Sequence, residues 1–300
     1  MAFGRRTLLL GLSVAACSRR EAPSPPARVA PVSGDRGEVD VLEWQTDGVS
    51  TRAVVLRPRW TSGTRLPVLI ALHGRGEAVK APAAGAMGWP RDYALTRAIA
   101  RASAPPLTGA DYEGFFDPIR LARENERLAE RPFAGLVVIC PHLPDLDASR
   151  ESVVAEVGRF FADVLLPRAH REAPVLASAA ATGIDGVSMG GHFALRVGLS
   201  RPDRFGAVGA LQAAIDPGRV SALVTLARTA RAARDSLALR LTTSHDDGYA
   251  EANRALSRGL LAAGIRHDFA EVPGPHDYAF NRGPGAYEML LWHDRVLART

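Results

Sequence analysis

The chain has 300 residues, of which 47% are hydrophobic and 23% are charged, and its formal net charge is +5. This composition is that of an ordinary soluble globular protein, and the length allows one or two domains. The positive charge is almost entirely arginine, with Lys80 as the single lysine, and no basic cluster is interleaved with aromatic residues. A nucleic-acid-binding function is therefore not expected.

The N-terminus has the features of an export signal. Arg5 and Arg6 precede an apolar run over residues 7–16, which is too short to cross a bilayer as a permanent helix. The small residues before Cys17 resemble a bacterial lipobox, in which the cysteine is lipidated and becomes the mature N-terminus. We therefore expect residues 1–17 to be a signal peptide, exported by the general secretory or the twin-arginine route. A lipid on Cys17 would then anchor the protein to a membrane in the cell envelope or periplasm.

The remaining chain divides into a linker and one folded domain. Residues 18–37 are Pro-rich and polar, which predicts a disordered tether. Residues 38–300 suffice for a single α/β domain. Its first two strands are predicted over residues 38–44 and 51–56 as an antiparallel pair, and the short apolar run over residues 68–72 predicts a third strand.

A long section follows between residues 77 and 132. It contains two predicted helices, over residues 92–101 and 117–131, with a loop over residues 104–116 between them. Ordinary crossovers between strands are shorter than this. The section is therefore expected either to cover the mouth of a site or to be an irregular crossover that never touches substrate.

Strands and helices alternate through the second half of the chain. A strand is predicted over residues 136–140, ending in Cys140, which has no disulfide partner once Cys17 is lipidated and is expected to be a buried thiol. Further strands are predicted before residue 186 and over residues 205–211, 237–241 and 267–272, and further helices over residues 151–170, 222–233 and 284–299. This alternation predicts an α/β fold with a mostly parallel central sheet and helices on both faces.

The motif G-V-S-M-G at residues 186–190 lies between a predicted strand and a predicted helix. In that context a G-x-S-x-G sequence places a serine hydroxyl at the tip of a sharp turn, in a strained backbone conformation. Ser188 is therefore the candidate nucleophile. The following helix would offer unpaired N–H groups and a positive dipole end to a developing oxyanion.

A serine nucleophile needs a base, and the base needs an orienting acid. Downstream of Ser188, the strand over residues 237–241 leads to Asp246 and Asp247, which compete for the acid, and we favour Asp247 because a helix begins directly after it. The next strand leads to His276 on a Gly- and Pro-rich loop, the candidate base. The chain order Ser, Asp, His is that of hydrolases with this turn.

The oxyanion hole would complete such a site. The backbone N–H of Met189 supplies the first donor, and the loop after the strand over residues 68–72 supplies the second. We assign the second donor to Arg75, with Gly76 as the alternative.

Four segments together resemble the esterase D and enterochelin-esterase-like branch of the α/β-hydrolase superfamily. They are L-H-G-R-G at residues 72–76, G-V-S-M-G-G-H at 186–192, R-P-D-R-F-G-A-V-G-A at 201–210 and G-P-H-D-Y at 274–278. The resemblance covers about residues 38–298 and implies an acyl-ester hydrolase with a triad of Ser188, Asp247 and His276. Asp247 matches the family because it stands six residues before Asn253, in the pattern D-x-x-x-x-x-N.

The sequence favours ester hydrolysis over other functions. No His-x-x-x-His or Cys-x-x-Cys spacing occurs, so neither a metal nor another cofactor is expected, and the expected partner is a small-molecule ester. Two alternatives stay open. A peptidase of the same fold is disfavoured because no gating domain is present, and a non-catalytic surface lipoprotein is disfavoured by the intact spacing of the triad.

Overall fold

The computed structural model describes Met1, residues 37–61 and residues 63–299. Apart from Met1, the predicted signal peptide with Cys17 lies outside this part of the chain, and so does the predicted tether apart from its last residue. Among the described residues, every helix is too short or too polar to serve as a membrane span.

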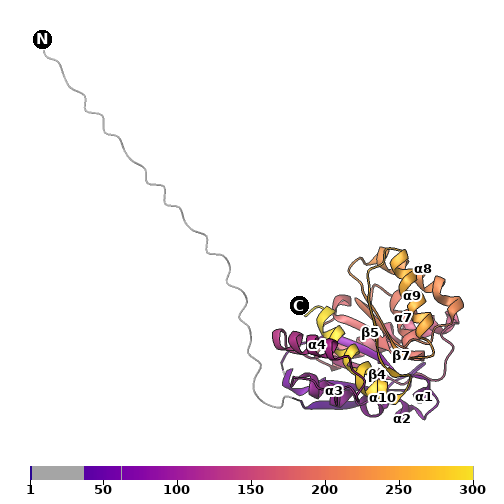
Figure 1. The fold of residues 1–300 in the computed structure, drawn as a ribbon, viewed down its shortest axis with the longest axis horizontal. Helices are drawn as coiled ribbons and strands as arrows, with labels where there is room; N and C mark the ends of the chain where they lie inside the picture. The colour runs from indigo at the N-terminus through magenta and orange to yellow at the C-terminus, as the bar shows by residue number, and fades with distance from the viewer. Residues whose placement is uncertain (2–36, 62, 300) are drawn as a thin grey trace. The chain divides into compact units, whose positions relative to one another are not determined.

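The strands of residues 37–299 form one eight-stranded sheet in the order β1-β2-β4-β3-β5-β6-β7-β8 (Figure 1). They are β1 (Val39–Gln45), β2 (Arg52–Pro58), β3 (Val68–Leu72), β4 (Val137–Pro141), β5 (Thr182–Gly186), β6 (Ala207–Leu211), β7 (Ala238–Asp246) and β8 (Asp268–Pro275). The β1–β2 and β2–β4 pairs are antiparallel and all other pairs are parallel. The predicted fold class is therefore confirmed.

Helices cover both faces of this sheet. They are α1 (Arg75–Ala78), α2 (Pro82–Ala86), α3 (Leu95–Ala102), α4 (Pro118–Glu130), α5 (Glu151–Arg159), α6 (Leu166–Glu172), α7 (Met189–Ser200), α8 (Val220–Ala233), α9 (Ala250–Ala262), α10 (Tyr278–Phe280) and α11 (Ala286–Val296). In Figure 1, α7, α8 and α9 lie on one side of the strands, and α3 and α4 lie on the other.

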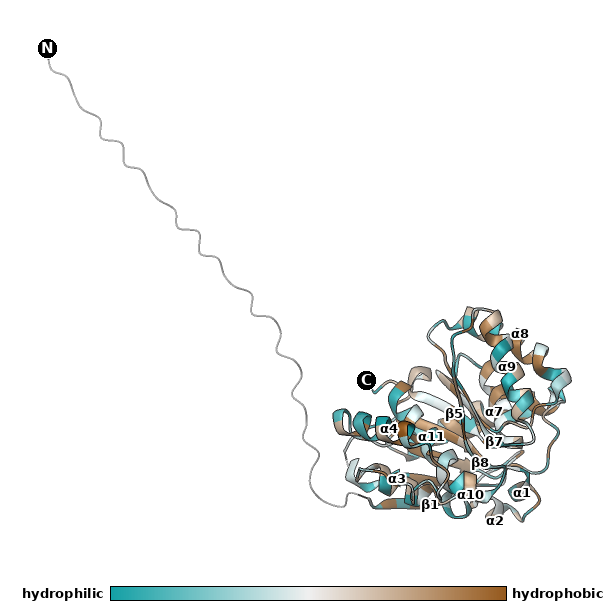
Figure 2. Cartoon of the chain, in the orientation of Figure 1, coloured by the Kyte–Doolittle hydropathy of each residue, from teal (hydrophilic) through white to brown (hydrophobic). Residues whose placement is uncertain are grey.

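Two buried hydrophobic clusters fill these layers because side chains alternate along each strand. On β3, Ile70 packs with Phe193 of α7 in the first cluster, whereas Leu69 packs with Ile99 of α3 in the second. Figure 2 shows the hydrophobic residues gathered along the strands, while the outer helix α4 is largely hydrophilic. In α4 only Leu128 is buried.

Cys140 lies within β4, and its thiol is free and buried. Burial raises the pKa of this thiol well above its ordinary value. The expectation of a buried structural thiol is confirmed.

Two predicted helices differ from those observed. The helix expected over residues 92–101 begins only at Leu95, because Ala94 has a left-handed backbone with φ of 52°. The residues before it form α1, α2 and a π turn over Gly88–Asp92. The helix expected over residues 151–170 is divided by a π segment over Phe160–Leu165, just before Pro167, whose missing N–H breaks the α-helical hydrogen-bond ladder.

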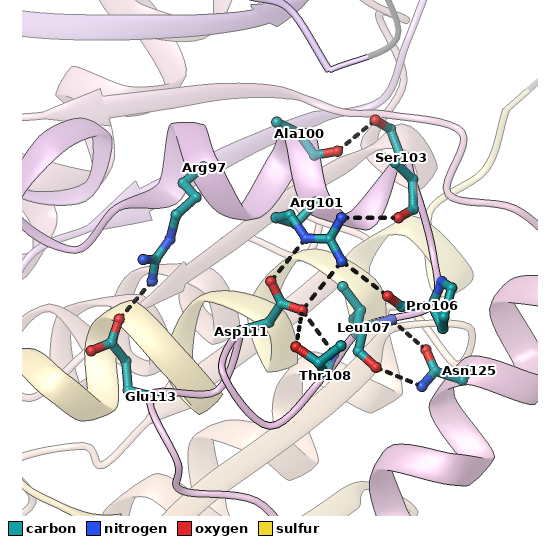
Figure 3. A network of polar contacts seen from close by, with 11 residues as sticks. Arg97, Ala100, Arg101, Ser103, Pro106, Leu107, Thr108, Asp111, Glu113 and Asn125 are labelled. Carbon is teal, nitrogen blue, oxygen red and sulfur yellow. Dashed lines mark hydrogen bonds and ion pairs between the residues drawn. The ribbon is translucent and has the colours of Figure 1, made fainter.

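The loop between α3 and α4 is held in place by polar contacts (Figure 3). Arg101 donates to Asp111 at 2.9 Å and to the carbonyl of Pro106 at 2.9 Å. Asn125 of α4 accepts from the N–H of Leu107 at 2.7 Å and donates to the carbonyl of the same residue at 2.8 Å. This fixed loop brings Phe115 beside Gly274, where a β-carbon would lie 3.6 Å from the Phe115 β-carbon.

Candidate active site

Ser188 occupies the turn between β5 and α7. Its backbone has φ of 57° and ψ of −118°, outside the regions that side chains ordinarily favour. The turn is nevertheless well supported: the Ser188 N–H donates to the carbonyl of Leu211 at 3.0 Å, and the Ser188 carbonyl accepts from the N–H of Ala214 at 3.0 Å. The hydroxyl-bearing residue is half-buried at the carboxyl edge of the sheet.

Two glycines allow this turn to pack against the end of β3. A β-carbon on Gly186 would lie 2.6 Å from the carbonyl group of Gly190. One on Gly190 would lie 2.5 Å from the carbonyl oxygens of Leu72 and His73. Real β-carbons do not approach backbone atoms this closely, so the G-x-S-x-G pattern follows from steric exclusion at both positions.

Asp247 stands just past β7, with its side chain fully buried. Its Oδ2 accepts from the Thr243 hydroxyl at 2.6 Å, and its Oδ1 accepts from the N–H of Tyr249 at 2.9 Å. The remaining contact of Oδ1 is with His276 Nδ1 at 2.8 Å. Asp246, the competing residue, is exposed and pairs with the β8 strand through its backbone.

His276 follows directly after β8 and joins the two other residues. Its Nε2 lies 3.0 Å from the Ser188 Oγ, while its Nδ1 contacts Asp247. The imidazole packs against the ring of Tyr249 at a centroid distance of 5.5 Å. The three residues predicted from the sequence therefore form one hydrogen-bonded chain. Ser188 and His276, its first and last members in the sequence, are 88 positions apart.

Two buried amides support this chain and were not recognised in the sequence as parts of the site. Gln212, with φ of 44°, donates to the Ser244 hydroxyl at 2.6 Å and to the Pro275 carbonyl at 2.8 Å, next to His276. Asn253 donates to the carbonyl of Ala213 at 2.9 Å and so fixes α9 against the turn of Ser188. The D-x-x-x-x-x-N spacing could have indicated the second of these roles, whereas nothing in the local sequence marks the first.

The His-Gly turn after β3 lies beside the serine. A β-carbon on Gly74 would be 3.7 Å from the Ser188 β-carbon. His73 stabilises the turn by accepting from the N–H of Leu143 at 3.0 Å, and burial lowers the pKa of its imidazole to about 4. Its ring lies 5.5 Å from that of His142, which is also buried and packs behind the turn.

The two residues expected to form an oxyanion hole each begin a helix. Met189 is the first residue of α7 and Arg75 the first of α1. Within the described residues, neither backbone N–H has a hydrogen-bond acceptor, as is usual for the first turn of a helix. The Arg75 guanidinium is 73% exposed and forms an ion pair with Asp145 at 2.8 Å, so it does not fold back over its own N–H.

A buried charged cluster lies in the sheet beneath the serine turn. Asp185 of β5 is fully buried and contacts Arg240 of β7 at 2.6 Å and His293 of α11 at 2.9 Å. Burial by itself raises the pKa of Asp185, but Arg240 and His293 outweigh it and hold that pKa below its ordinary value. Gly209 makes room for the carboxylate, because a β-carbon there would lie 1.9 Å from the Asp185 Oδ2.

The part of the chain that the structure describes contains no group of three or more His, Cys, Asp or Glu side chains arranged to hold a metal ion. Its polar groups near Ser188 are instead those of nucleophile, base and acid. A mostly parallel sheet with a serine turn after β5, an acid after β7 and a histidine after β8 defines the α/β-hydrolase class.

Comparison with known proteins agrees with this class. Residues 145–280 match the model of a family described as putative esterase, and this span contains Ser188, Asp247 and His276. No curated protein matches the chain. The fold and the match over residues 145–280 agree in placing this domain in the α/β-hydrolase fold.

Solved structures show the same architecture at low sequence identity. A ferulic acid esterase has a TM-score of 0.61 and 17% identity, over 87% of this chain and 98% of that one. The S-formylglutathione hydrolase FrmB of Staphylococcus aureus has a TM-score of 0.57 and 16% identity, over 86% and 96%. The fluorophosphonate-binding serine hydrolase FphF of the same organism has a TM-score of 0.58 and 15% identity, over 86% and 98%.

Proposed function

We propose that the protein hydrolyses carboxylic esters through an acyl-enzyme formed on Ser188, with His276 as general base and Asp247 as the orienting acid. The single observation that carries this proposal is the continuous chain from the Ser188 Oγ through the imidazole to the buried carboxylate, with contacts of 3.0 and 2.8 Å. Both distances are within hydrogen-bond reach for proton transfer in a free enzyme.

The geometry supports a separate chemical role for each of the three side chains. The Ser188 oxygen attacks the ester carbonyl while His276 Nε2 takes the hydroxyl proton and then gives it to the leaving alcohol. The contact of Nδ1 with Asp247 fixes the tautomer in which Nε2 can accept that proton. Water then hydrolyses the acyl-enzyme by the same steps, and Ser188 is regenerated.

We assign the oxyanion hole to the backbone N–H groups of Met189 and Arg75. Both groups lack an acceptor among the described residues and begin helices, where the N–H donors are free and the local potential is positive. Each such donor lowers the barrier by roughly 3 kcal/mol when it contacts the developing oxyanion.

The proposal is tested with the full-length chain and a Ser188→Ala variant. Wild-type protein is expected to release p-nitrophenol from short-chain acyl esters and to be labelled by a fluorophosphonate probe. The variant is expected to lose both activities while keeping its circular dichroism spectrum, because removal of the nucleophile leaves the fold intact. Equal turnover by the variant would refute the assignment of Ser188. A wild-type protein that neither turns over esters nor reacts with the probe would favour the non-catalytic alternative.

We propose, in addition, that the protein is an exported lipoprotein held to a membrane through Cys17. The support is the sequence alone: two arginines, a short apolar run and small residues before the cysteine. In a bacterial host fed with radiolabelled palmitate, the full-length chain is expected to incorporate label and to sediment with membranes. Cys17→Ala should abolish both, and label retained in that variant would exclude Cys17 as the lipidated residue.

A further inference from the structure

A second polar network joins the two loops that flank Ser188, and the triad does not use it. Its centre is Glu77 in α1, a carboxylate whose side chain is only 1% exposed. Figure 1 shows α1 and α10 at the same edge of the molecule, although about 200 residues separate them. Burying a carboxylate costs free energy unless it is hydrogen-bonded. The groups that contact Glu77 therefore show which parts of the site this network joins.

Two tyrosine hydroxyls donate to the Glu77 carboxylate. Tyr278 donates to Oε1 at 2.5 Å, and Tyr93 donates to Oε2. The two rings also meet edge to face, with their centroids 5.4 Å apart. Tyr278 is the second residue after His276, so this contact fixes the loop that carries the imidazole.

The other end of the network holds the His-Gly turn. The Tyr93 hydroxyl accepts from the N–H of Gly74 at 3.3 Å, and Gly74 directly precedes the proposed oxyanion donor Arg75. Glu77 itself donates its N–H to the carbonyl of Gly74 at 3.3 Å. The backbone of the oxyanion loop is therefore tied to the same carboxylate as the histidine loop.

Lys80 compensates the charge of the buried carboxylate. Its Nζ lies 3.3 Å from Glu77 Oε1, 3.1 Å from Asp92 Oδ2 and 3.3 Å from the Tyr278 hydroxyl. With a cation at this distance, the network can sit beside an oxyanion site without adding an uncompensated negative charge.

We propose that Glu77 is a positioning residue of the hydrolase, which sets the separation between the oxyanion donor of the His-Gly turn and the imidazole of His276. This inference depends on the proposed function, because it assigns to Glu77 the alignment of the same reaction. The donor and the base act at the same moment on one carbonyl group, so a small change in their spacing lowers the rate of reaction more than it lowers substrate binding.

The test uses the full-length chain and the variant Tyr278→Phe, which keeps the exposed ring and removes only the hydroxyl that contacts Glu77 and Lys80. Against a short-chain p-nitrophenyl ester, kcat is expected to fall by about tenfold to a hundredfold, with KM within about twofold of wild type. Glu77→Gln should lower kcat at least as much. The double variant should be no slower than Glu77→Gln alone, because both changes act on the same contact between Tyr278 and Glu77.

Tyr112→Phe is the matched control. Tyr112 is buried and stacks on the ring of Tyr287, and its hydroxyl forms no hydrogen bond with the described residues. The kcat of the Tyr112→Phe variant should stay within about twofold of that of the wild type.

Unchanged kcat in Tyr278→Phe would overturn the inference, and so would losses that multiply in the double variant. A loss of kcat that follows a fall in thermal midpoint across the variants would also overturn it, since Glu77 would then act only on folding. Failure of the proposed function has a different signature, namely equal turnover by wild type and Ser188→Ala, and it would overturn both proposals together.

Discussion

Replacement of Arg240 by methionine should test how the buried cluster beneath the serine turn stabilises the sheet. Arg240 contacts the Asp185 Oδ2 at 2.6 Å, and the Asp185 side chain is 0% exposed. After the substitution Asp185 keeps His293 and the N–H of Gly186, which donates to its Oδ1 at 2.7 Å, but loses its permanent cation. Breaking a buried ion pair in this way costs about 3–5 kcal/mol.

Such a loss is a large share of the total stability of a domain, which is roughly 5–15 kcal/mol. We expect the thermal midpoint to fall by about 6–20 °C, at roughly 2–4 °C per kcal/mol for a chain of this size. Urea unfolding followed by tryptophan fluorescence gives the free energy of unfolding. Trp292 lies 5.4 Å from the Arg240 guanidinium and should report on this cluster.

The same variant should show a characteristic pH dependence. Burial lowers the pKa of His293, Asp185 raises it, and Arg240 lowers it further. Without Arg240 the imidazole should take up a proton at a higher pH and compensate Asp185, so the destabilisation should be smaller at pH 6 than at pH 8.

The double variant Asp185→Asn/Arg240→Met, which removes both charges, should recover at least about 1 kcal/mol of the lost stability. A loss below about 1 kcal/mol for Arg240→Met, independent of pH, would show that charge pairing is not what holds this cluster.

Three further outcomes follow from the site. Burial lowers the pKa values of His73 and His192 to about 4, whereas in the unfolded chain these histidines bind protons near pH 6.5. The free energy of unfolding should therefore fall by about 3 kcal/mol per histidine between pH 6.5 and 4, and it should level off below pH 4. Urea unfolding across this pH range measures the change. Gly190→Ala should unfold or inactivate the protein because its β-carbon would meet two carbonyl oxygens at 2.5 Å; wild-type turnover and melting would contradict this. Asp247→Asn should lower kcat by about 10⁴-fold, while Asp246→Asn should leave it nearly unchanged, and the reverse order in a p-nitrophenyl ester assay would identify Asp246 as the acid.

Much of the fold could be predicted because local patterns mark it. Short apolar runs bounded by glycine, proline and polar residues located the strands, and the sharp turn at Ser188 requires glycines that are visible in the sequence. The positions of Asp247 and His276 also follow from local features, since each stands directly after a strand whose carboxyl end faces the site.

The supporting networks could not be predicted in the same way. Arg240 and His293 contact Asp185 across 55 and 108 positions, and Tyr278 contacts Glu77 across 201. Nothing periodic connects such residues, and each of them alone has the character of an ordinary surface polar group. The π segment after α5 was missed for a different reason, because its apolar spacing still fits a continuous helix.

The single thiol among residues 37–61 and 63–299 has a consequence for how this part of the chain folds. Cys140 is sealed inside a central strand and is the only cysteine between residues 37 and 299, so folding of this part requires no oxidant and risks no mispaired crosslink. The native state of these residues therefore does not depend on a disulfide within them.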